Sequence, residues 1–182
     1  MIDPPMQPEL SGDAVALRPM RARDFDALFA LASDPEIWAI HPAHDRWQKP
    51  VFRAFFDEGL ASGGALVVED RTSGAMIGHS RYDTGYCLPG EVEIGWTFLS
   101  RAHWGGATNR AIKRLMISHA FESGFDAVIF RIGENNWRSR RALEKIGGAL
   151  TDRTQVADMA RGAELHVIYR IDRVAFASGP LA

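Results

Sequence analysis

Two glycines between a strand-like run and a helix-like run are the clearest sign of chemistry in this sequence. Gly105 and Gly106 follow the run 91–99 and precede a helix-like run that continues to Glu122. A loop of this kind offers unpaired backbone N–H groups and the positive end of a helix dipole to an anion. The loop therefore indicates an anion-binding site, although a tight strand-to-helix turn explains the glycines equally well. It is neither a Walker loop nor a GxGxxG fingerprint.

A second segment of interest begins at Asn136, at the start of a short helix-like run that ends at Gly147. Ser139 follows in the first turn and carries a hydroxyl group. Short polar side chains at such positions accept hydrogen bonds from the free N–H groups of the helix start. A capping role is therefore expected for Asn136, whatever else this segment does.

The strand-like run 91–99 carries Glu93, our preferred candidate for a general base. Side chains alternate between the two faces of a strand. One face is expected to hold Glu91, Glu93, Gly95 and Thr97, and the other Val92, Ile94, Trp96 and Phe98. Because the apolar face must be buried, Glu93 is expected to face a less apolar space, where a carboxylate can accept a proton. A solvated strand carboxylate is the alternative, and His79 is a weaker candidate base.

Composition limits the function classes. The chain has 182 residues, of which 46% are hydrophobic and 24% charged, as expected for one globular domain. The lead-in 1–13 is expected to be flexible, 14–175 to form the domain, and 176–182 to be a tail. The net charge of -2 provides no global positive field, so we expect neither nucleic acid nor an anionic membrane as a partner.

The cysteine and histidine residues bear on the cellular location of the protein and on whether it has a disulfide or a metal site. The single cysteine, Cys87, excludes an internal disulfide and favours a cytoplasmic location. Cys87 lies in a turn without a matched His and Asp, so a cysteine nucleophile is not expected. His41 and His44 are a close pair without cysteine partners, so no metal site is expected. No window approaches the roughly 18 apolar residues needed to cross a bilayer.

The elements that must position these residues can be read from hydrophobic periodicity. Strands are expected at 15–18, 65–70, 75–83, 91–99, 127–132, 149–157 and 165–173. Helices are expected from Asp24 to Asp34, from Pro50 to Glu58, from the glycine loop to Glu122, and at 138–146. This order predicts a single-domain mixed α/β (α+β) fold. Its twisted, mostly antiparallel sheet has roughly seven strands and is flanked by roughly four helices, with 127–132 in a parallel pair.

Two ordered motifs add a resemblance to a known family. The first is Trp104-Gly105-Gly106-Ala107-Thr108-Asn109-Arg110, preceded by Glu-Ile-Gly-Trp at 93–96. The second consists of Asn136, Ser139, Leu143, Glu144, Lys145 and Gly147. Together they resemble the GCN5-related N-acetyltransferase (GNAT) superfamily, and within it the branch of ribosomal-protein N-terminal acetyltransferases. The resemblance covers 15–173, and it departs from the common pattern in having Trp104 for Gln or Arg and Ala107 for Gly.

The resemblance implies acetyl-CoA as a co-substrate, without a metal. The pantetheine arm would pair with free backbone groups near Phe98 and Leu99, and the pyrophosphate would lie on the N–H groups of 105–109. The implied cofactor-binding residues are Phe98, Leu99, Trp104, Gly105, Gly106, Ala107, Thr108, Asn109, Arg110 and Asn136. The nearby Lys113 either attracts the phosphates or is a solvated charge on the helix.

The resemblance also implies the activity and its remaining residues. Direct transfer of acetyl to a primary amine, either a protein N-terminus or a small amine, is expected, with Glu93 as base. Many superfamily members have a catalytic Tyr where this chain has Leu143, so Ser139 is the implied acid, unless it only starts its helix. Substrate-binding residues are expected to be Trp38, His41, Arg81 and Tyr82. Another acyl-CoA donor, a non-catalytic acyl-CoA sensor and a homodimer stay open.

Overall fold

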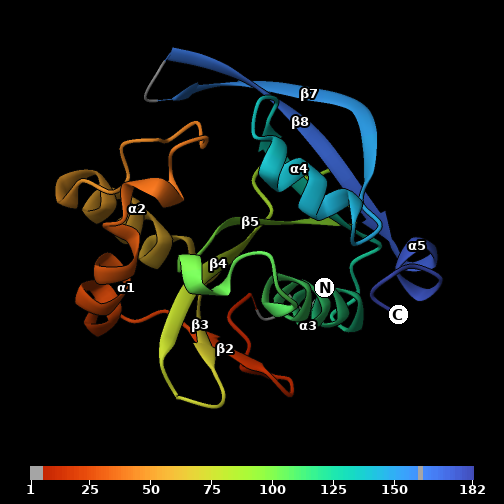
Figure 1. The fold of residues 1–182 in the computed structure, drawn as a ribbon. Coiled ribbons are helices and arrows are strands. Elements are labelled where there is room, and N and C mark those ends of the chain that lie inside the picture. The colour runs from red at the N-terminus through yellow and green to blue at the C-terminus, as the bar shows by residue number, and fades with distance from the viewer. Residues whose placement is uncertain (1–5, 160–161) are drawn as a thin grey trace.

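Eight strands and five α-helices make up the described part of the chain, residues 6–159 and 162–182 of a computed structural model (Figure 1). The strands are β1 (Leu10–Ser11), β2 (Val15–Pro19), β3 (Ala65–Asp70), β4 (Met76–Asp83), β5 (Glu91–Leu99), β6 (Ala127–Gly133), β7 (Ala149–Met159) and β8 (Gly162–Asp172). The helices are α1 (Phe25–Ala32), α2 (Lys49–Ser62), α3 (Thr108–Glu122), α4 (Trp137–Glu144) and α5 (Arg173–Ala177). The expected mixed α/β fold is confirmed.

All strands belong to one open sheet in the order β1-β2-β3-β4-β5-β6-β8-β7. Each neighbouring pair is antiparallel except β5 and β6, which are parallel because α3 carries the chain back between them. Figure 1 shows α3 below β5 and α4 above it in this view, and both helices contribute to the same core. Within 6–159 and 162–182, no helix is both long enough and apolar enough to cross a membrane.

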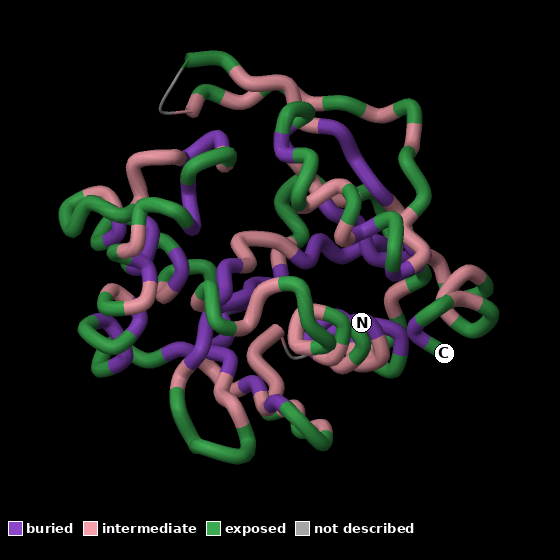
Figure 2. The backbone as a smooth tube through the Cα atoms, viewed as in Figure 1, coloured by how far each residue is buried: buried purple, intermediate pink, exposed green. Residues whose placement is uncertain are grey.

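The two faces of the sheet pack into separate cores. Figure 2 shows that the buried positions are concentrated in the central strands and on parts of the helices that cover them. One core joins α3, through Ile112 and Met116, to apolar side chains of β2 to β6 and of β8. The other joins α1 and α2 to β3 and β5 and is rich in aromatic rings, such as Phe25 and Phe52. Burial of this apolar area on both faces is the main stabilising term for the fold. Both faces of β5 are therefore covered, and its position in the sheet is fixed.

Three boundaries differ from the sequence expectation. Leu10–Ser11 pairs with β2, so the end of the expected lead-in belongs to the sheet, whereas residues 1–5 lie outside the described part. The expected tail is packed, since Leu181 is 1% exposed in the α3 core. Helix α2 continues past Gly59 to Ser62, and the chain leaves it at Gly63 with φ of 66°. Glycine tolerates this left-handed conformation at a helix end.

A β-bulge in β5 corrects the expected alternation of its side chains. Trp96 has φ of 52°, and the pairing with β4 shifts by one residue between His79 and Arg81. An extra residue in one strand reverses the faces of the side chains beyond it. Phe98 therefore lies in the α1/α2 core, and not with Ile94 on the α3 face as expected. Part of the expected turn of the β7–β8 hairpin, residues 160–161, lies outside the described residues.

Candidate active site

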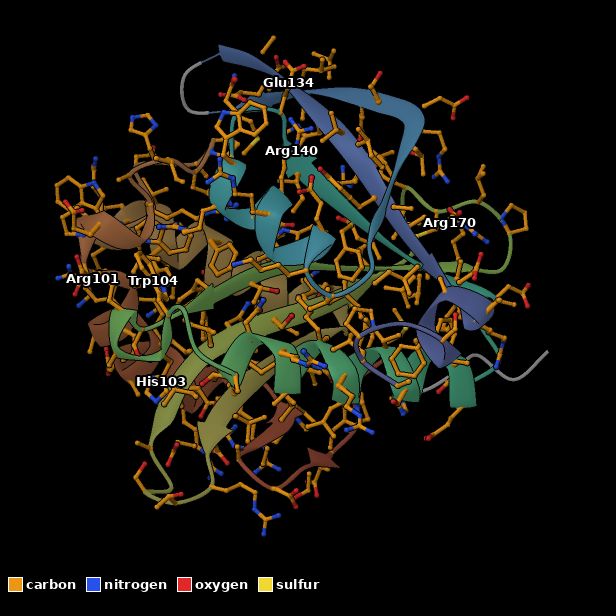
Figure 3. All side chains as sticks on the ribbon, turned by 45° about the vertical axis from the view of Figure 1, so that its right-hand side comes forward. Arg101, His103, Trp104, Glu134, Arg140 and Arg170 are labelled. Atoms are coloured by element: carbon orange, nitrogen blue, oxygen red, sulfur yellow. The ribbon has the colours of Figure 1, made fainter. Side chains whose placement is uncertain are left out.

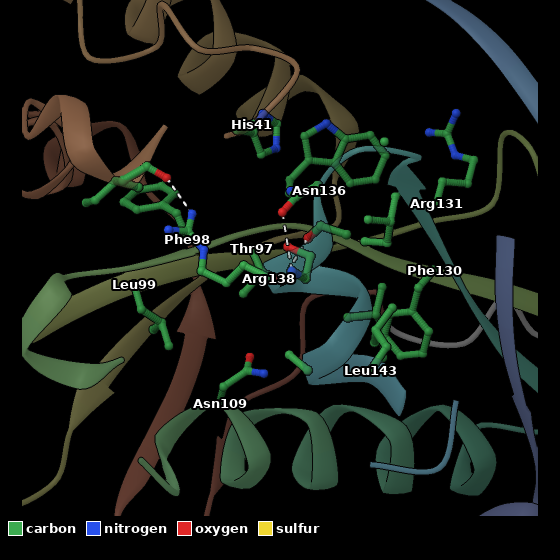
Figure 4. A pocket seen from close by; sticks show the side chains of 18 of the residues that line it. His41, Thr97, Phe98, Leu99, Asn109, Phe130, Arg131, Asn136, Arg138 and Leu143 are labelled. Carbon is green, nitrogen blue, oxygen red and sulfur yellow. Dashed lines mark hydrogen bonds between the residues drawn. The ribbon is translucent and has the colours of Figure 1, made fainter. Parts of the chain in front are cut away.

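A cavity of about 250 Å³ opens where β5 and β6 separate (Figure 4). These strands are paired at Glu91–Glu93 with Ala127–Ile129, and no further pairs follow between them in the described residues. Beyond this point the walls come from β5, β6, α3 and α4, with the 37–42 segment at one end. The lining includes these sequence candidates: Trp38, His41, Phe98, Leu99, Trp104, Gly105, Asn109, Asn136 and Ser139. The structure therefore brings the two motifs and part of the expected substrate set together.

One end of the cavity is the start of α3 (Figure 3). Gly105 has φ of 71°, a conformation that favours glycine. Among the described residues, the backbone N–H groups of 105–110 have no hydrogen-bond acceptor, whereas the N–H of Ala111 donates to the carbonyl of Ala107. The indole Nε1 of Trp104 donates to the carbonyl of Leu99 at 3.0 Å, which holds the loop against β5. This end can bind phosphate oxygens through backbone donors.

Four sequence candidates at this end do not line the cavity with their side chains. Gly106, Ala107 and Thr108 are not among the lining residues, and their backbone N–H groups have no acceptor in the described part of the chain. The guanidinium of Arg110 is exposed and donates to the carbonyl of Pro180, so it is directed toward the C-terminal segment. Lys113, one turn after Asn109, is instead buried and lines the cavity.

The second motif forms a wall of the cavity through α4. Asn136 is 4% exposed, and its Oδ1 accepts a hydrogen bond from the N–H of Ser139 at 3.3 Å. The expected capping role of Asn136 is therefore confirmed. Ser139 also lines the cavity, and its hydroxyl has no hydrogen-bond partner in the described part of the chain. Leu143, on the same helix, contributes an apolar surface.

The opposite end of the cavity is lined by Trp38 and His41. Nδ1 of His41 accepts a hydrogen bond from the N–H of Ala43 at 3.0 Å, so the neutral ring carries its proton on Nε2. Burial, reinforced by the charges of Arg46 and Arg138, lowers the pKa of His41 to about 3. His41 is therefore a neutral hydrogen-bond donor at pH 7. An adjoining hollow shares His41 with the cavity and is also lined by Glu164.

Arg81 and Tyr82 lie outside the cavity lining. The hydroxyl of Tyr82 donates to the carbonyl of Met116 at 2.6 Å, since alternation along β4 places this ring in the α3 core. Arg81 is 6% exposed and forms ion pairs with Glu58 at 2.8 Å and with Asp83 at 2.6 Å. The structure therefore does not bring these two expected substrate residues into the site.

The candidate base Glu93 is buried behind the cavity wall. Its carboxylate accepts a hydrogen bond from Nε of Arg131 at 2.8 Å, and it is 2% exposed. Burial raises the pKa of Glu93, and the charge of Arg131 opposes that rise. Arg131 lines the cavity, whereas Glu93 does not. His79 also lies outside the lining, with Nδ1 2.9 Å from the carbonyl of Trp96, and burial lowers its pKa to about 4.

A second histidine of the cavity, His166, was missed by sequence reasoning. It lies on β8 opposite Gly133, and Nδ1 is 3.3 Å from the carbonyl of Glu164. A carbonyl only accepts, so Nδ1 carries the proton and the lone pair of Nε2 is left for a ligand. Burial lowers the pKa of His166, which keeps it neutral at pH 7. Alternation along β8 could have pointed to His166. Val167, Tyr169 and Ile171 face the α3 core, so His166 must face the other side of the strand.

Comparison with known proteins identifies the family. The family model described as the acetyltransferase (GNAT) domain matches residues 15–149. The chain belongs to the GNAT acetyltransferase family. Membership supports acyl transfer from an acyl-CoA, a reaction for which the GNAT cavity has a phosphate-compatible end and a polar opposite end. No curated protein matched the chain.

Solved structures share the GNAT fold at low sequence identity. A GCN5-related N-acetyltransferase from Brucella melitensis has a TM-score of 0.82 at 18% identity, covering 94% of this chain and 81% of its own. Mycobacterium smegmatis RimJ in complex with CoA-disulfide has a TM-score of 0.71 at 16% identity, covering 96% and 90%. The ribosomal-protein-S5-alanine acetyltransferase of Vibrio fischeri has a TM-score of 0.67 at 13% identity, covering 91% and 97%.

Proposed function

We propose that this GNAT protein is an acetyl-CoA-dependent N-acetyltransferase that moves the acetyl group directly to a primary amine. The observation that carries the proposal is one continuous cavity with different chemistry at its two ends. Unpaired N–H groups of 105–110 lie at one end, and the neutral rings of His41 and His166 lie at the other. Such an arrangement suits a donor with phosphates at one end and an acceptor amine at the other.

The residues present fit coenzyme A. The N–H groups of 105–110 can hold the pyrophosphate, as the Gly105 loop leaves them open. The pairing of β5 with β6 ends at Glu93, and Phe98 and Leu99 line the cavity beyond that point. Backbone groups of this part of β5, other than the Leu99 carbonyl that accepts from Trp104, can therefore bind the amides of the pantetheine arm. The complex of Mycobacterium smegmatis RimJ with CoA-disulfide, a fold neighbour, supports a CoA ligand in this fold. When bound, acetyl-CoA supplies the activated acetyl thioester.

An acceptor amine must lose a proton before it can attack, because an alkylammonium has a pKa near ~10.4. His166 can accept this proton, since the residue lines the cavity, its Nε2 carries no proton and its ring is neutral at pH 7. Glu93, the base proposed from the sequence, reaches the cavity only through Arg131. We therefore assign proton acceptance to His166, with Glu93 holding Arg131 in place.

For the acceptor, we propose a protein N-terminus of the kind that the ribosomal-protein branch acetylates. The hollow beside the cavity supports an extended acceptor, because it continues from His41 past Asn135 to the carboxylate of Glu164. The Nε2–H of His41 can donate to a peptide carbonyl. The fold likeness to RimJ and to the S5-alanine acetyltransferase is consistent with this acceptor class. A homodimer and a cytoplasmic location stay predictions.

A panel of acceptors tests the proposal. Ribosomal-protein N-terminal peptides and small amines are incubated with acetyl-CoA, and CoA thiol release is measured along with the mass of each acceptor. The same peptides with a blocked N-terminus are the matched controls. Acetylation of free N-termini only would support the proposal, and reaction of small amines only would move the acceptor to a small molecule. Tight CoA binding without turnover on any amine would replace the enzyme by an acyl-CoA sensor.

A further inference from the structure

A single lysine is buried in the middle of the cavity. Lys113 on α3 is 5% exposed, and its Nζ donates to Oγ1 of Thr97 on β5 at 2.8 Å. The Nζ is also 5.5 Å from the ring centroid of Phe130 on β6. An ammonium group has three donors, and Thr97 is its one acceptor among the described residues. Two N–H donors are therefore left for a ligand in the cavity.

Within residues 6–159 and 162–182, no carboxylate is paired with this ammonium. The elements packed against Lys113 present to it the hydroxyl of Thr97 from β5, the ring of Phe130 from β6, and the side chain of Leu143 across the cavity from α4. The remaining titratable and charged groups of the described cavity lining are His41, His103, Arg131, Arg138 and His166. None of them is acidic. A buried ammonium without a counter-ion is costly, and such groups are found where a ligand or a reaction uses them.

The position of Lys113 matches the place of reaction. The donor enters from the start of α3 at Asn109, and the acceptor enters from His41, so the reacting atoms meet between these ends. Figure 4 shows Thr97, the hydrogen-bond partner of Lys113, between His41 and Asn109. Thr97 directly follows Trp96, whose positive φ marks the bulge in β5. Lys113 on α3 therefore lies against the part of the cavity that Thr97 lines, between the two ends.

We propose that Lys113 is the general acid that protonates the departing thiolate of CoA, an inference that rests on the proposed acetyl transfer. In that step the carbon–sulfur bond breaks and its electron pair goes to sulfur. The ammonium of Lys113 gives one proton to the sulfur and becomes a neutral amine. The acceptor nitrogen forms its bond to the acetyl carbon after its first proton has passed through His166 to solvent, and its second proton goes to His166 as the tetrahedral intermediate collapses. Exchange with solvent then restores His166 and Lys113. The products are the acetylated amine and CoA thiol.

The acidity of Lys113 suits this role. Burial lowers its pKa from 10.5 to about 7, and an alkyl thiol has a pKa near ~8.5. Proton transfer from the ammonium to the thiolate is therefore downhill. Ser139 also lines the cavity, but a serine hydroxyl has no comparable acidity, and its backbone N–H is engaged with Asn136. Lys113 thus gives directly a proton that the hydroxyl of Ser139 could give only if another acid returned a proton to it.

Two substitutions at one position separate acid catalysis from charge and from packing. Lys113→Met keeps the length of the side chain and removes the proton, whereas Lys113→Arg keeps a charge that cannot be given up near neutral pH. Arg141→Met, at an exposed position of α4, is the control for the loss of a positive charge. Steady-state kinetics with acetyl-CoA and the reactive amine are measured across pH, and calorimetry gives the Kd of CoA.

Wild-type kcat is expected to fall as pH rises through the pKa of Lys113. Both Lys113 variants should lose about 100-fold or more in kcat and lose this alkaline limb, with the Kd of CoA within about threefold of wild type. Arg141→Met should behave as wild type. A Lys113→Met enzyme with wild-type kcat, or an active Lys113→Arg enzyme, would overturn the acid role. A similar kcat loss in Ser139→Ala with Lys113→Met unaffected would give the role to Ser139. A wild-type enzyme without turnover on any amine would contradict the proposed function itself, whereas the outcomes above contradict only the role of Lys113.

Discussion

Replacement of Lys113 by Met should stabilise the protein at neutral pH and change how its stability depends on pH. The pKa of Lys113 is about 7 in the folded chain, against 10.5 for a free lysine, because burial penalises the ammonium. The unfolded chain therefore binds more protons than the folded chain between these values, so the free energy of unfolding rises with pH in this window. Each pH unit is worth about 1.4 kcal/mol, and the full penalty below pH 7 is about 5 kcal/mol.

The assay is chemical denaturation of the wild-type protein and of Lys113→Met at about pH 7.5 and about pH 9. The variant should be more stable at the lower pH, and its advantage should shrink by about 2 kcal/mol at the higher pH, because wild-type Lys113 becomes neutral. Comparing the two proteins cancels the common titration of Cys87 and Tyr82, whose pKa values burial raises. Parallel stability curves across this pH range would refute the claim that Lys113 is a desolvated ammonium.

Four further substitutions test the site. His166→Gln should lower kcat about 100-fold and remove the acidic limb of the kcat/KM profile, whereas Glu93→Gln should keep that limb; the opposite pattern in steady-state kinetics would make Glu93 the base. Gly105→Ala should weaken CoA binding in calorimetry by about fivefold or more, since a φ of 71° costs a residue with a Cβ roughly 1 to 2 kcal/mol; an unchanged Kd would separate the loop conformation from binding. Tyr82→Phe should lower the free energy of unfolding by about 1 kcal/mol through the lost hydrogen bond to Met116 and leave the KM of the amine unchanged; a raised KM would place Tyr82 at the acceptor.

Most of the fold follows from local sequence patterns. The β4 and β5 runs, the helix α3 after the glycine loop and the parallel placement of β6 are all predictable, because apolar periodicity and turn residues mark them. The short pairing of Leu10–Ser11 with β2 could not be predicted, since a two-residue strand has no periodicity of its own. The packed C-terminal segment also escapes prediction, because the contact of Leu181 with the α3 core joins residues far apart in the sequence.

The bulge at Trp96 explains the main error within the site. Strict alternation along β5 places Phe98 with Ile94, but the extra residue turns Phe98 toward Trp38, with ring centroids 5.3 Å apart. The residue types do not predict the bulge. Glycine is the usual residue at positive φ, and here that conformation is adopted by Trp96. Neighbouring strand pairing imposes that conformation. The roles of Arg81 and Tyr82, which the family resemblance implied, depend instead on which contacts β4 makes in the folded chain: Arg81 pairs with Glu58 and Asp83, and the Tyr82 hydroxyl bonds to Met116.

Residues within the two motifs could be predicted as site residues from local sequence, whereas isolated residues of the site could not. The two motifs lie on opposite walls of one cavity, since Asn109 and Asn136 each start a wall whose geometry is local. Lys113 and His166 come from the middle of a helix and of a strand, where a charged or titratable residue usually faces solvent. Only the separation of β5 from β6 makes their positions interior. Their relevance is a property of the tertiary arrangement, which a single sequence does not contain.

The charge of the cavity links its two proposed substrates. The chain has a net charge of -2, yet the charged groups that line the cavity in the described residues are Lys113, Arg131 and Arg138, and Glu93 is compensated by Arg131. This positive lining favours the phosphates of the donor. It also opposes the entry of an ammonium, so the acceptor binds better as a neutral amine. The positive charge that attracts the donor therefore also lowers the pKa of the acceptor amine. A larger fraction of the acceptor then binds as the neutral amine, and fewer acceptor molecules need His166 to take up a proton before they attack.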